Sequence, residues 1–301
     1  MQNQRKSTPP VASVSGTAGT KEDRHFVTAL ARGLDVLSVF RPLDRVLGNQ
    51  ELARRSGLPK STVSRLTYTL TKLGYLEPAP DGCGGAGYRL GSRVLALGST
   101  LLQRLDVRAL ARPLMQELAD QSRTMVALGT PDRKSMIYIE TCRSQATVTL
   151  RLNVGSRIPM ATTAMGRAYL AICSEGERTA LMERFRDGDP LRWPLVEQGI
   201  LGALETHGRH GCCTSFTEWQ SDVNAVAVAF RVAGQPPLAI SCGGLACSSA
   251  TDYLMDTVRP RMLRLVERLV RLGSSAPDAP VQPARAASMS ALSDSGLSRG
   301  A

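Results

Sequence analysis

The stretch that decides the fold is residues 48–76, GNQELARRSGLPKSTVSRLTYTLTKLGYL. An apolar stripe begins at Leu52 and Ala53 and is interrupted at Gly57. A second stripe follows at spacings of three and four, and its members are Val63, Leu66, Leu70 and Leu73. This period is typical of helices that bury one face. Two such short helices, joined by about three residues that include a glycine, form a helix-turn-helix.

The other face of the second helix carries small hydroxyl groups beside basic side chains. A helix of this kind enters the major groove of DNA while its Leu/Val face packs inward. Arg65 and Ser64 are the candidates for contacts with base edges. The remaining side chains predicted at this surface, most of them as phosphate contacts, are Lys60, Ser61, Thr62 and Tyr68. The alternative is a helical hairpin whose basic residues are only solvated.

The residues after the second helix have the pattern of a wing. Gly74 ends the helix. A Gly-rich segment, 81–87, then separates two short stretches with strand character, the second of which is Tyr88-Arg89-Leu90. Strand, flexible loop and strand describe a wing, and Arg89 is suited to a phosphate or minor-groove contact.

Charge is unevenly distributed along the 301 residues, which suffice for two domains. Residues 1–100 hold 14 Lys/Arg against 7 Asp/Glu, a net charge of +7, whereas residues 101–301 hold 23 against 19, a net charge of +4. A basic first third beside a nearly balanced remainder fits DNA binding combined with a second task that involves no nucleic acid.

Composition also bears on the cellular compartment. No run approaches the roughly 20 apolar residues of a membrane span, and the polar N-terminus has no secretory signal. The seven cysteines are odd in number and contain no CxxC pair, which fits reduced thiols. We therefore expect a cytoplasmic protein with no membrane partner.

Five segments follow from these patterns. Residues 1–22 and 274–301, rich in Ser, Pro and Gly or Ala, are expected to be disordered tails. Residues 23–91 form the winged helix-turn-helix domain, and 92–106 form a linker helix that packs against a partner subunit. Residues 107–273 form a second domain of mixed character.

Apolar spacing predicts the main elements of both domains. The first helix, 28–40, has one face made of Leu30, Leu34, Leu37 and Phe40. In the second domain a helix is marked by Leu110, Leu114 and Leu118, and strands are predicted at 136–142, 147–154, 224–232 and 237–242. Further helices are predicted at 162–172, 176–185 and 252–272.

A candidate ligand site lies where the chain passes from a Gly-Ser turn into a helix at residues 153–171. Thr162 and Thr163 stand in the predicted first turn, with Gly166 close behind. Free backbone N–H groups at such a start favour an anion, and small residues leave room for a carboxylate. The alternative is ordinary N-capping by Thr162 or Thr163.

Metal and catalytic chemistry find little support. His207, His210, Cys212 and Cys213 lie within seven residues, but their spacing matches no zinc signature, because adjacent cysteines rarely ligate one ion. Loop residues, or a partly occupied site for a soft metal, explain them better. We predict no metal site, no cofactor and no catalytic residues, since the chain contains none of the common catalytic motifs.

Three segments together resemble the IclR family of bacterial transcriptional regulators over residues 25–272. They are ELARRSGLPKSTVSRL, YRLGSRVLALG and GSRIPMATTAMGRAYLA. The resemblance implies an α+β protein with an N-terminal winged helix-turn-helix, a linker helix and a C-terminal α/β effector-binding domain with a curved antiparallel sheet. It also implies homodimers or homotetramers that bind palindromic operators and respond to small metabolites, often organic acids.

The resemblance also implies which residues bind the effector. They are Ala161, Thr162, Thr163, Ala164, Met165 and Gly166 at the helix start, with Ser215, Ala225, Ser241 and Gly243 from the later part of the domain. The chain departs from the family pattern at Arg167, Asp222 and Ala229, and it places Trp219 near the expected pocket mouth.

These expectations describe a DNA-binding regulator that is not an enzyme. Its predicted partners are a double-stranded DNA operator, a small-molecule effector and further copies of the same chain. Two alternatives remain at this point. One is an enzyme with an appended DNA-binding module, and the other is a metal-responsive or architectural DNA-binding protein.

Overall fold

The computed structural model describes most of the chain, namely residues 25–41, 44–80, 86–103, 106–144, 152–232 and 235–274. The predicted tails 1–22 and 274–301 lie outside these ranges, apart from Ser274, which ends the last helix. The glycines of the predicted wing loop at 82–85 and the first part of the predicted strand 147–154 also lie outside them.

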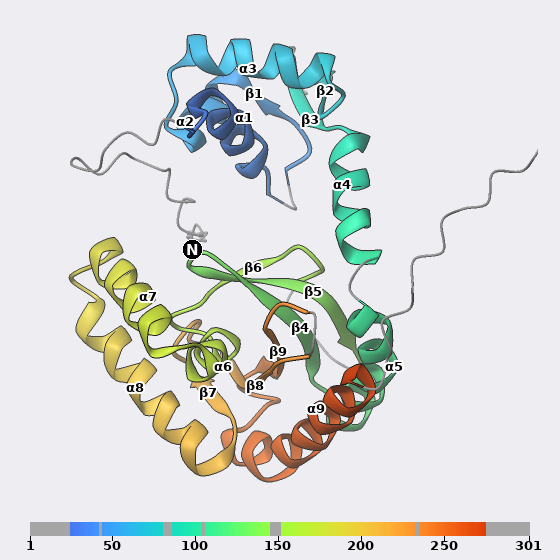
Figure 1. Cartoon of the computed structure of the whole chain (residues 1–301), viewed down its shortest axis with the longest axis vertical. Coiled ribbons are helices and arrows are strands. Elements are labelled where there is room, and N and C mark those ends of the chain that lie inside the picture. The colour runs from blue at the N-terminus through green and yellow to red at the C-terminus, as the bar shows by residue number, and fades with distance from the viewer. Residues whose placement is uncertain are drawn as a thin grey trace, which may run out of the picture.

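The N-terminal module contains the predicted helix-turn-helix and wing strands (Figure 1). Gly57, with a φ of 70°, ends the first helix of the motif in the left-handed conformation that glycine adopts without strain. The three strands pair in the order β1-β3-β2. The elements are α1 (Thr28–Ser38), β1 (Leu47–Gly48), α2 (Asn49–Ser56), α3 (Lys60–Lys72), β2 (Leu76–Pro80) and β3 (Ala86–Leu90).

The core of this module follows the predicted stripes with one exception. Leu52, Val63 and Leu70 are buried. Leu73 is 48% exposed, contrary to the prediction, because it is the C-cap at which α3 ends. Thr67 is fully buried instead, and its hydroxyl reaches the side chain of Asn49 at 3.2 Å, which joins α3 to the start of α2.

Two helices of this half keep apolar surface exposed. In α1 the buried positions are Gly33 and Val36, while Leu30 and Leu34 are 61% and 54% exposed. The linker helix α4 (Ser92–Gln103) runs from the module to the second domain (Figure 1) and exposes three of its leucines, Leu95, Leu97 and Leu101.

The second domain is built on a sheet that, over the described residues, has six antiparallel strands in the order β6-β5-β4-β9-β8-β7. Helices cover both faces (Figure 1). The elements are α5 (Asp106–Ser122), β4 (Met125–Asp132), β5 (Ser135–Arg143), β6 (Arg157–Pro159), α6 (Ala164–Ile172), α7 (Glu175–Gly188), α8 (Trp193–His210), β7 (Cys213–Phe216), β8 (Val223–Phe230), β9 (Leu238–Leu245), the π-helix η1 (Tyr253–Val258) and α9 (Arg259–Ser274).

Strand alternation gives the two faces of this sheet different sizes of side chain. Val226 and Ile240 point to the face covered by α5 and α9, where they join a core of large apolar residues. Their neighbours Ala227 and Ala239, with Ala127, point to the face covered by α6. Successive side chains of a strand point to opposite faces, so small residues collect under α6 and let it approach the sheet closely.

Some predicted elements differ from those observed. Residues 152–154 are not a strand, because Asn153 and Ser156 close a turn through two hydrogen bonds of 2.9 Å. β5 pairs with β4 on one side, and the strand on its other side is β6. Three observed elements, β4, β7 and α8, were not predicted. Gly and Pro residues interrupt the apolar periodicity of β4 and α8. β7 is only four residues long, too short to show a pattern.

The predicted helix 252–272 has the expected buried stripe but begins differently. Leu254, Val258, Met262 and Leu269 are fully buried. Its first part is the π-helix η1, which changes to α-helix just before Pro260, a residue with no N–H to donate.

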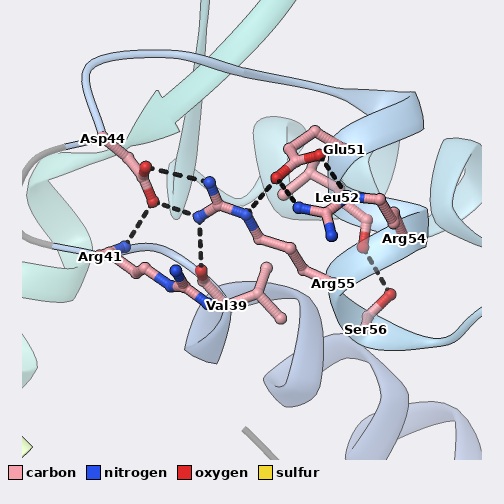
Figure 2. A network of polar contacts seen from close by, with 8 residues as sticks. All are labelled: Val39, Arg41, Asp44, Glu51, Leu52, Arg54, Arg55 and Ser56. Atoms are coloured by element: carbon pink, nitrogen blue, oxygen red, sulfur yellow. Dashed lines mark hydrogen bonds and ion pairs between the residues drawn. The ribbon is translucent and has the colours of Figure 1, made fainter. Parts of the chain in front are cut away.

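A chain of ion pairs fastens α2 to the loop before it (Figure 2). Arg55 contacts Asp44 at 2.5 Å and the Glu51 carboxylate at 2.5 Å, and it donates to the carbonyl oxygen of Val39. Arg54 donates two further hydrogen bonds to Glu51, at 2.8 and 2.6 Å. The hydrogen bonds from Arg54 lower the pKa of Glu51 most, and the hydrogen bond and the positive charge of Arg55 lower it further. Partial burial opposes them, and the pKa falls from its usual 4.5 to about 2.

This lowered pKa predicts a pH-dependent contribution to stability. The ionised form of Glu51 is favoured in the folded state, so its contribution is complete above about pH 4.5 and is lost as the pH falls toward 2. We expect Glu51→Gln to lower the free energy of unfolding by about 1 kcal/mol at pH 7, and the difference from wild type to shrink below pH 4.5. Urea denaturation at a series of pH values measures it.

The exposed Glu183 of α7 supplies the control, because it forms no ion pair within the described part of the chain. Glu183→Gln should leave the unfolding free energy at pH 7 within a few tenths of a kcal/mol of wild type. A Glu51→Gln deficit that stayed constant down to pH 3 would contradict the assignment.

Candidate functional site

The outward surface of α3 is the first candidate site. Lys60, Ser61, Ser64, Arg65 and Tyr68 are all exposed. Thr62 is half-buried, and Lys72 extends the surface by placing its ammonium 5.7 Å from the centre of the Tyr68 ring. The six predicted DNA-contacting residues of α3 therefore leave donors and charge open to a partner on one side of the module.

Arg89 is placed less freely than the sequence suggested. It stands in β3 opposite Glu77 of β2, and its guanidinium lies 2.8 Å from the Glu77 carboxylate. Both side chains are largely exposed. Solvent-exposed ion pairs of this kind are weak, so a phosphate that approached the wing would compete with Glu77 for the same guanidinium.

The second candidate site is a pocket at the start of α6, to which all six strands of the described sheet contribute. Its empty volume is about 450 Å³, part of it open to solvent. None of the described residues that line it is charged. They are Met125, Ala127, Tyr138, Ile158, Thr163, Ala164, Met165, Ser215, Trp219, Val223, Ala225, Ser241 and Gly243.

Seven of the ten residues predicted to bind an effector line this pocket, and three do not. Those in the lining are Thr163, Ala164, Met165, Ser215, Ala225, Ser241 and Gly243. Ala161 and Thr162 stand just outside, where their carbonyl oxygens accept hydrogen bonds from Arg167 and Ser215. Gly166 packs against the backbone of Met160.

The helix starts two residues later than predicted, at Ala164. Thr163 is its N-cap, with an extended backbone, and its hydroxyl accepts from the Gly166 N–H at 3.2 Å and donates to the Pro159 carbonyl oxygen at 2.7 Å. Capping by Thr163, the alternative left open by the sequence, therefore takes place. It leaves the N–H groups of Ala164 and Met165, which have no acceptor inside the helix, next to the pocket that these two residues line.

A buried pair of hydroxyl groups lies in the strand wall of the pocket. Tyr138 of β5 and Ser241 of β9 are 5% and 7% exposed and hydrogen-bonded to each other. Burial raises the pKa of Tyr138 to about 12, and the hydrogen bond to Ser241 opposes this only in part. Tyr138 is therefore a neutral phenol at physiological pH, able to donate or accept one hydrogen bond.

The residues that the sequence missed come from strands distant in the chain. Tyr138 falls inside a predicted strand, but nothing in its neighbourhood distinguishes it from a core residue. Trp219, expected near the pocket mouth, does line the pocket. Ser215 was placed by the resemblance, although its strand β7 was not predicted.

An ion pair behind the pocket holds the segment that carries Trp219. Arg167 of α6, only 2% exposed, makes two hydrogen bonds of 2.7 and 2.6 Å to the Glu218 carboxylate. Its other donors reach the carbonyl oxygens of Ala161 and Thr214, both at 3.1 Å. A Cβ at Gly199 of α8 would lie 2.2 Å from the Arg167 guanidinium, so only glycine lets α8 pass this close.

The cluster of histidines and cysteines does not converge. His207 and His210 lie in the last turn of α8, not in a loop as the sequence suggested. Cys212 and Cys213 are both buried, but in the two different cores on opposite faces of the sheet. The described residues contain no group of three or more His, Cys, Asp or Glu side chains placed to hold a metal ion.

The sequence predicted no membrane span, and the helices of the structure can be compared with that prediction. None of the helices in the described ranges is both long and apolar enough to cross a bilayer.

Fold and sites together define a bacterial-type transcriptional regulator, with a winged helix-turn-helix joined to a ligand-binding domain. Two family models match the chain. The IclR helix-turn-helix domain matches residues 29–80, and the C-terminal domain of the bacterial transcriptional regulator IclR matches residues 99–263. The chain belongs to the IclR family of transcriptional regulators.

Individual relatives agree. The HTH-type transcriptional regulator TsaQ1/TsaQ2 of Comamonas testosteroni is 33% identical over 263 residues, which cover 86% of this chain and 91% of that protein. The crystal structure of an IclR family transcriptional regulator from Brucella abortus has 41% identity and a TM-score of 0.77, over 85% of this chain and 96% of that one. An IclR homologue from Microbacterium hydrocarbonoxydans, crystallised with 4-hydroxybenzoate, shares the fold at 22% identity and a TM-score of 0.63, over 81% of this chain and all of that one.

The start of α6 yields a prediction with a matched control. A Cβ at Gly166 would lie 2.1 Å from the Met160 carbonyl oxygen, and backbone cannot move aside as a flexible side chain does. We expect Gly166→Ala to lower the free energy of unfolding by about 1–3 kcal/mol. Gly176 of α7 meets nothing within 4 Å, so Gly176→Ala should be neutral or stabilising by up to about 1 kcal/mol.

Differential scanning calorimetry of the two variants beside wild type checks this prediction. Equal melting temperatures for Gly166→Ala and Gly176→Ala would show that α6 does not rest on the Met160 backbone.

Proposed function

We propose that this regulator binds a two-fold symmetric operator as a homodimer, or a dimer of dimers, and that a monocarboxylate in the α6 pocket sets its operator affinity. It acts on chromosomal DNA in the bacterial cytoplasm. The observation that carries the proposal is the combination, in one chain, of an exposed basic helix α3 and an uncharged pocket at the start of α6.

Exposed leucines support the dimer. Leu30 and Leu34 of α1, with Leu95 and Leu101 of α4, are more than half exposed. Apolar surface of this extent marks an interaction site, and a second copy of the chain would bury it on both sides of a two-fold axis. A single α3 reads only a few base pairs, so useful specificity needs two half-sites about one helical turn, ~34 Å, apart.

The lining of the pocket supports a singly charged ligand. The helix start supplies the equivalent of about half a positive charge, and no described lining residue adds a charge of either sign. One carboxylate on the Ala164 and Met165 N–H groups is therefore hydrogen-bonded and partly neutralised, whereas a second charge would be buried without a partner. Trp219 and the aliphatic lining suit a flat apolar body, and Tyr138 with Ser241 suits a hydroxyl or carbonyl group on it.

An enzyme with an appended DNA-binding module is the weaker alternative. General acid–base catalysis needs a positioned side chain with a pKa near the working pH. Among the described lining residues the titratable side chain is Tyr138, whose pKa is raised to about 12. We therefore propose binding without turnover.

Ligand response has a short structural route to the DNA-binding module. The linker α4 is separated by two residues from α5, which packs on β5 through Arg108 and Arg112, both paired with the buried Glu140. β5 also supplies Tyr138 to the pocket. A coupling free energy of ~1–3 kcal/mol between pocket and operator would change DNA affinity about 5- to 150-fold.

The DNA surface is tested by Arg65→Ala in the full chain. An operator selected in vitro from random duplexes by the wild-type protein serves as probe, and binding is measured by fluorescence anisotropy. If Arg65 reads a base, the substitution should weaken binding by ~1–3 kcal/mol and relax sequence preference at one position of each half-site. The exposed Arg186 of α7 gives the control, because Arg186→Ala removes the same charge elsewhere. Unchanged affinity and preference in Arg65→Ala would rule out the assigned role.

The ligand class is tested with a matched pair of acids. Sodium 4-hydroxybenzoate, a monoanion with a ring, should raise the melting temperature, because a ligand that binds only the folded state stabilises it. Terephthalate, which has a second carboxylate in place of the hydroxyl, should not. Stabilisation by both acids alike would contradict the inference of a single charge.

The pocket residues are tested in the same assay. Ser241→Ala removes one hydroxyl of the strand wall and should weaken 4-hydroxybenzoate binding by about 1 kcal/mol, roughly fivefold, while DNA affinity without ligand stays unchanged. The exposed Ser248 lies just beyond β9, so Ser248→Ala should behave as wild type. If Ser241→Ala lost ligand and DNA binding together, misfolding would explain the result instead.

A further inference from the structure

A second concave site lies on the opposite face of the sheet, between α5 and α9. Its empty volume is about 590 Å³, part of it open to solvent. Leucines from both helices form its floor, namely Leu114, Leu118 and Leu265. Three arginines of α9 stand over this floor, namely Arg261, Arg264 and Arg268.

The three arginines share one face of α9. Residues spaced by three, four and seven lie above one another on a helix, and at 1.5 Å per residue Arg261 and Arg268 are about 10 Å apart along the axis. Like charges at this spacing repel one another. The charge is therefore arranged as a row of donors along the groove.

Little in the groove compensates this charge. Its one described carboxylate is Glu117, which already accepts a hydrogen bond of 3.1 Å from Gln121. Arg261 reaches only the carbonyl oxygen of Gln121, at 3.5 Å. Within the described ranges no carboxylate forms an ion pair with any of the three arginines, two of which, Arg264 and Arg268, are exposed.

We propose that this groove binds a small organic polyanion, with two or more phosphate or carboxylate groups presented to the arginines. Guanidinium groups bind such oxygens in pairs of parallel hydrogen bonds. The leucine floor accepts an apolar part of the ligand. The groove therefore favours a ligand with several negative charges, whereas the α6 pocket, whose described lining carries no charge, favours a ligand with one.

The position of the groove gives it a route to the linker. α5 forms one wall and follows α4 after two residues. A ligand that joined α9 to α5 would act on the helix that follows the linker, on the side of the sheet away from α6 (Figure 1). This regulatory consequence rests on the proposed function, whereas binding to the groove does not.

The test is isothermal titration of the full-length protein with inorganic pyrophosphate, which carries several charges and cannot fill an apolar pocket. The variant Arg264→Gln/Arg268→Gln removes two donors of the groove. The control Arg184→Gln/Arg192→Gln removes the same charge from exposed residues of α7 and the start of α8. We expect wild type and control to bind one pyrophosphate per chain, and the groove variant to bind ~10-fold or more weakly.

Three results would overturn the proposal. Equal loss in both double variants would show a general effect of charge. Unchanged binding in Arg264→Gln/Arg268→Gln would place the anion elsewhere, for example on α3. The protein could instead fail to bind pyrophosphate but bind an acidic peptide, and lose the peptide only in the groove variant. That result would identify the groove as a docking site for a protein. A thermal melt of each variant, expected within a few degrees of wild type, confirms that it is folded.

Discussion

The close approach of α6 to the sheet is the constraint on which the ligand-binding domain depends. Two glycines make it possible: a Cβ would meet the Met160 backbone at Gly166 and the Met165 sulfur at Gly129. Ala127, Ala227 and Ala239 lie on this face beside larger residues such as Met125 and Tyr138, while the large apolar residues that pack against α5 and α9 lie on the other face. Because α6 lies close to the sheet, the N–H groups of its first residues border the pocket directly.

The same approach couples the pocket to its surroundings. Arg167 follows Gly166 in α6, and its buried guanidinium fixes the Trp219 segment through Glu218. Removing either partner would leave a buried or half-buried charge without its counterion, which is costly. A ligand that displaced the start of α6 would therefore move Arg167, Glu218 and Trp219 together.

Local signals made the DNA-binding module predictable, while the pocket needed long-range information. Gly57 and the leucine stripes lie within one continuous stretch, so their pattern alone predicted α2 and α3. Tyr138 and Ser241 meet only because β5 and β9 both flank β4 in the sheet, and no spacing in the sequence reports this order. The sequence also could not predict that Leu30 and Leu73 are exposed. An apolar stripe shows which residues share one face of a helix, but it does not show what covers that face. The DNA contacts and effector residues stay predictions.

The central claim is that a carboxylate at the start of α6 alters the connection to the DNA-binding module. Hydrogen–deuterium exchange of the full chain, with and without a saturating monocarboxylate chosen by its stabilising effect, tests it most directly. The account predicts slower exchange at the amides of Ala164 and Met165 and at β9, together with a changed rate in α4. Slower exchange confined to other segments, or an α4 that exchanges identically in both states, would contradict it.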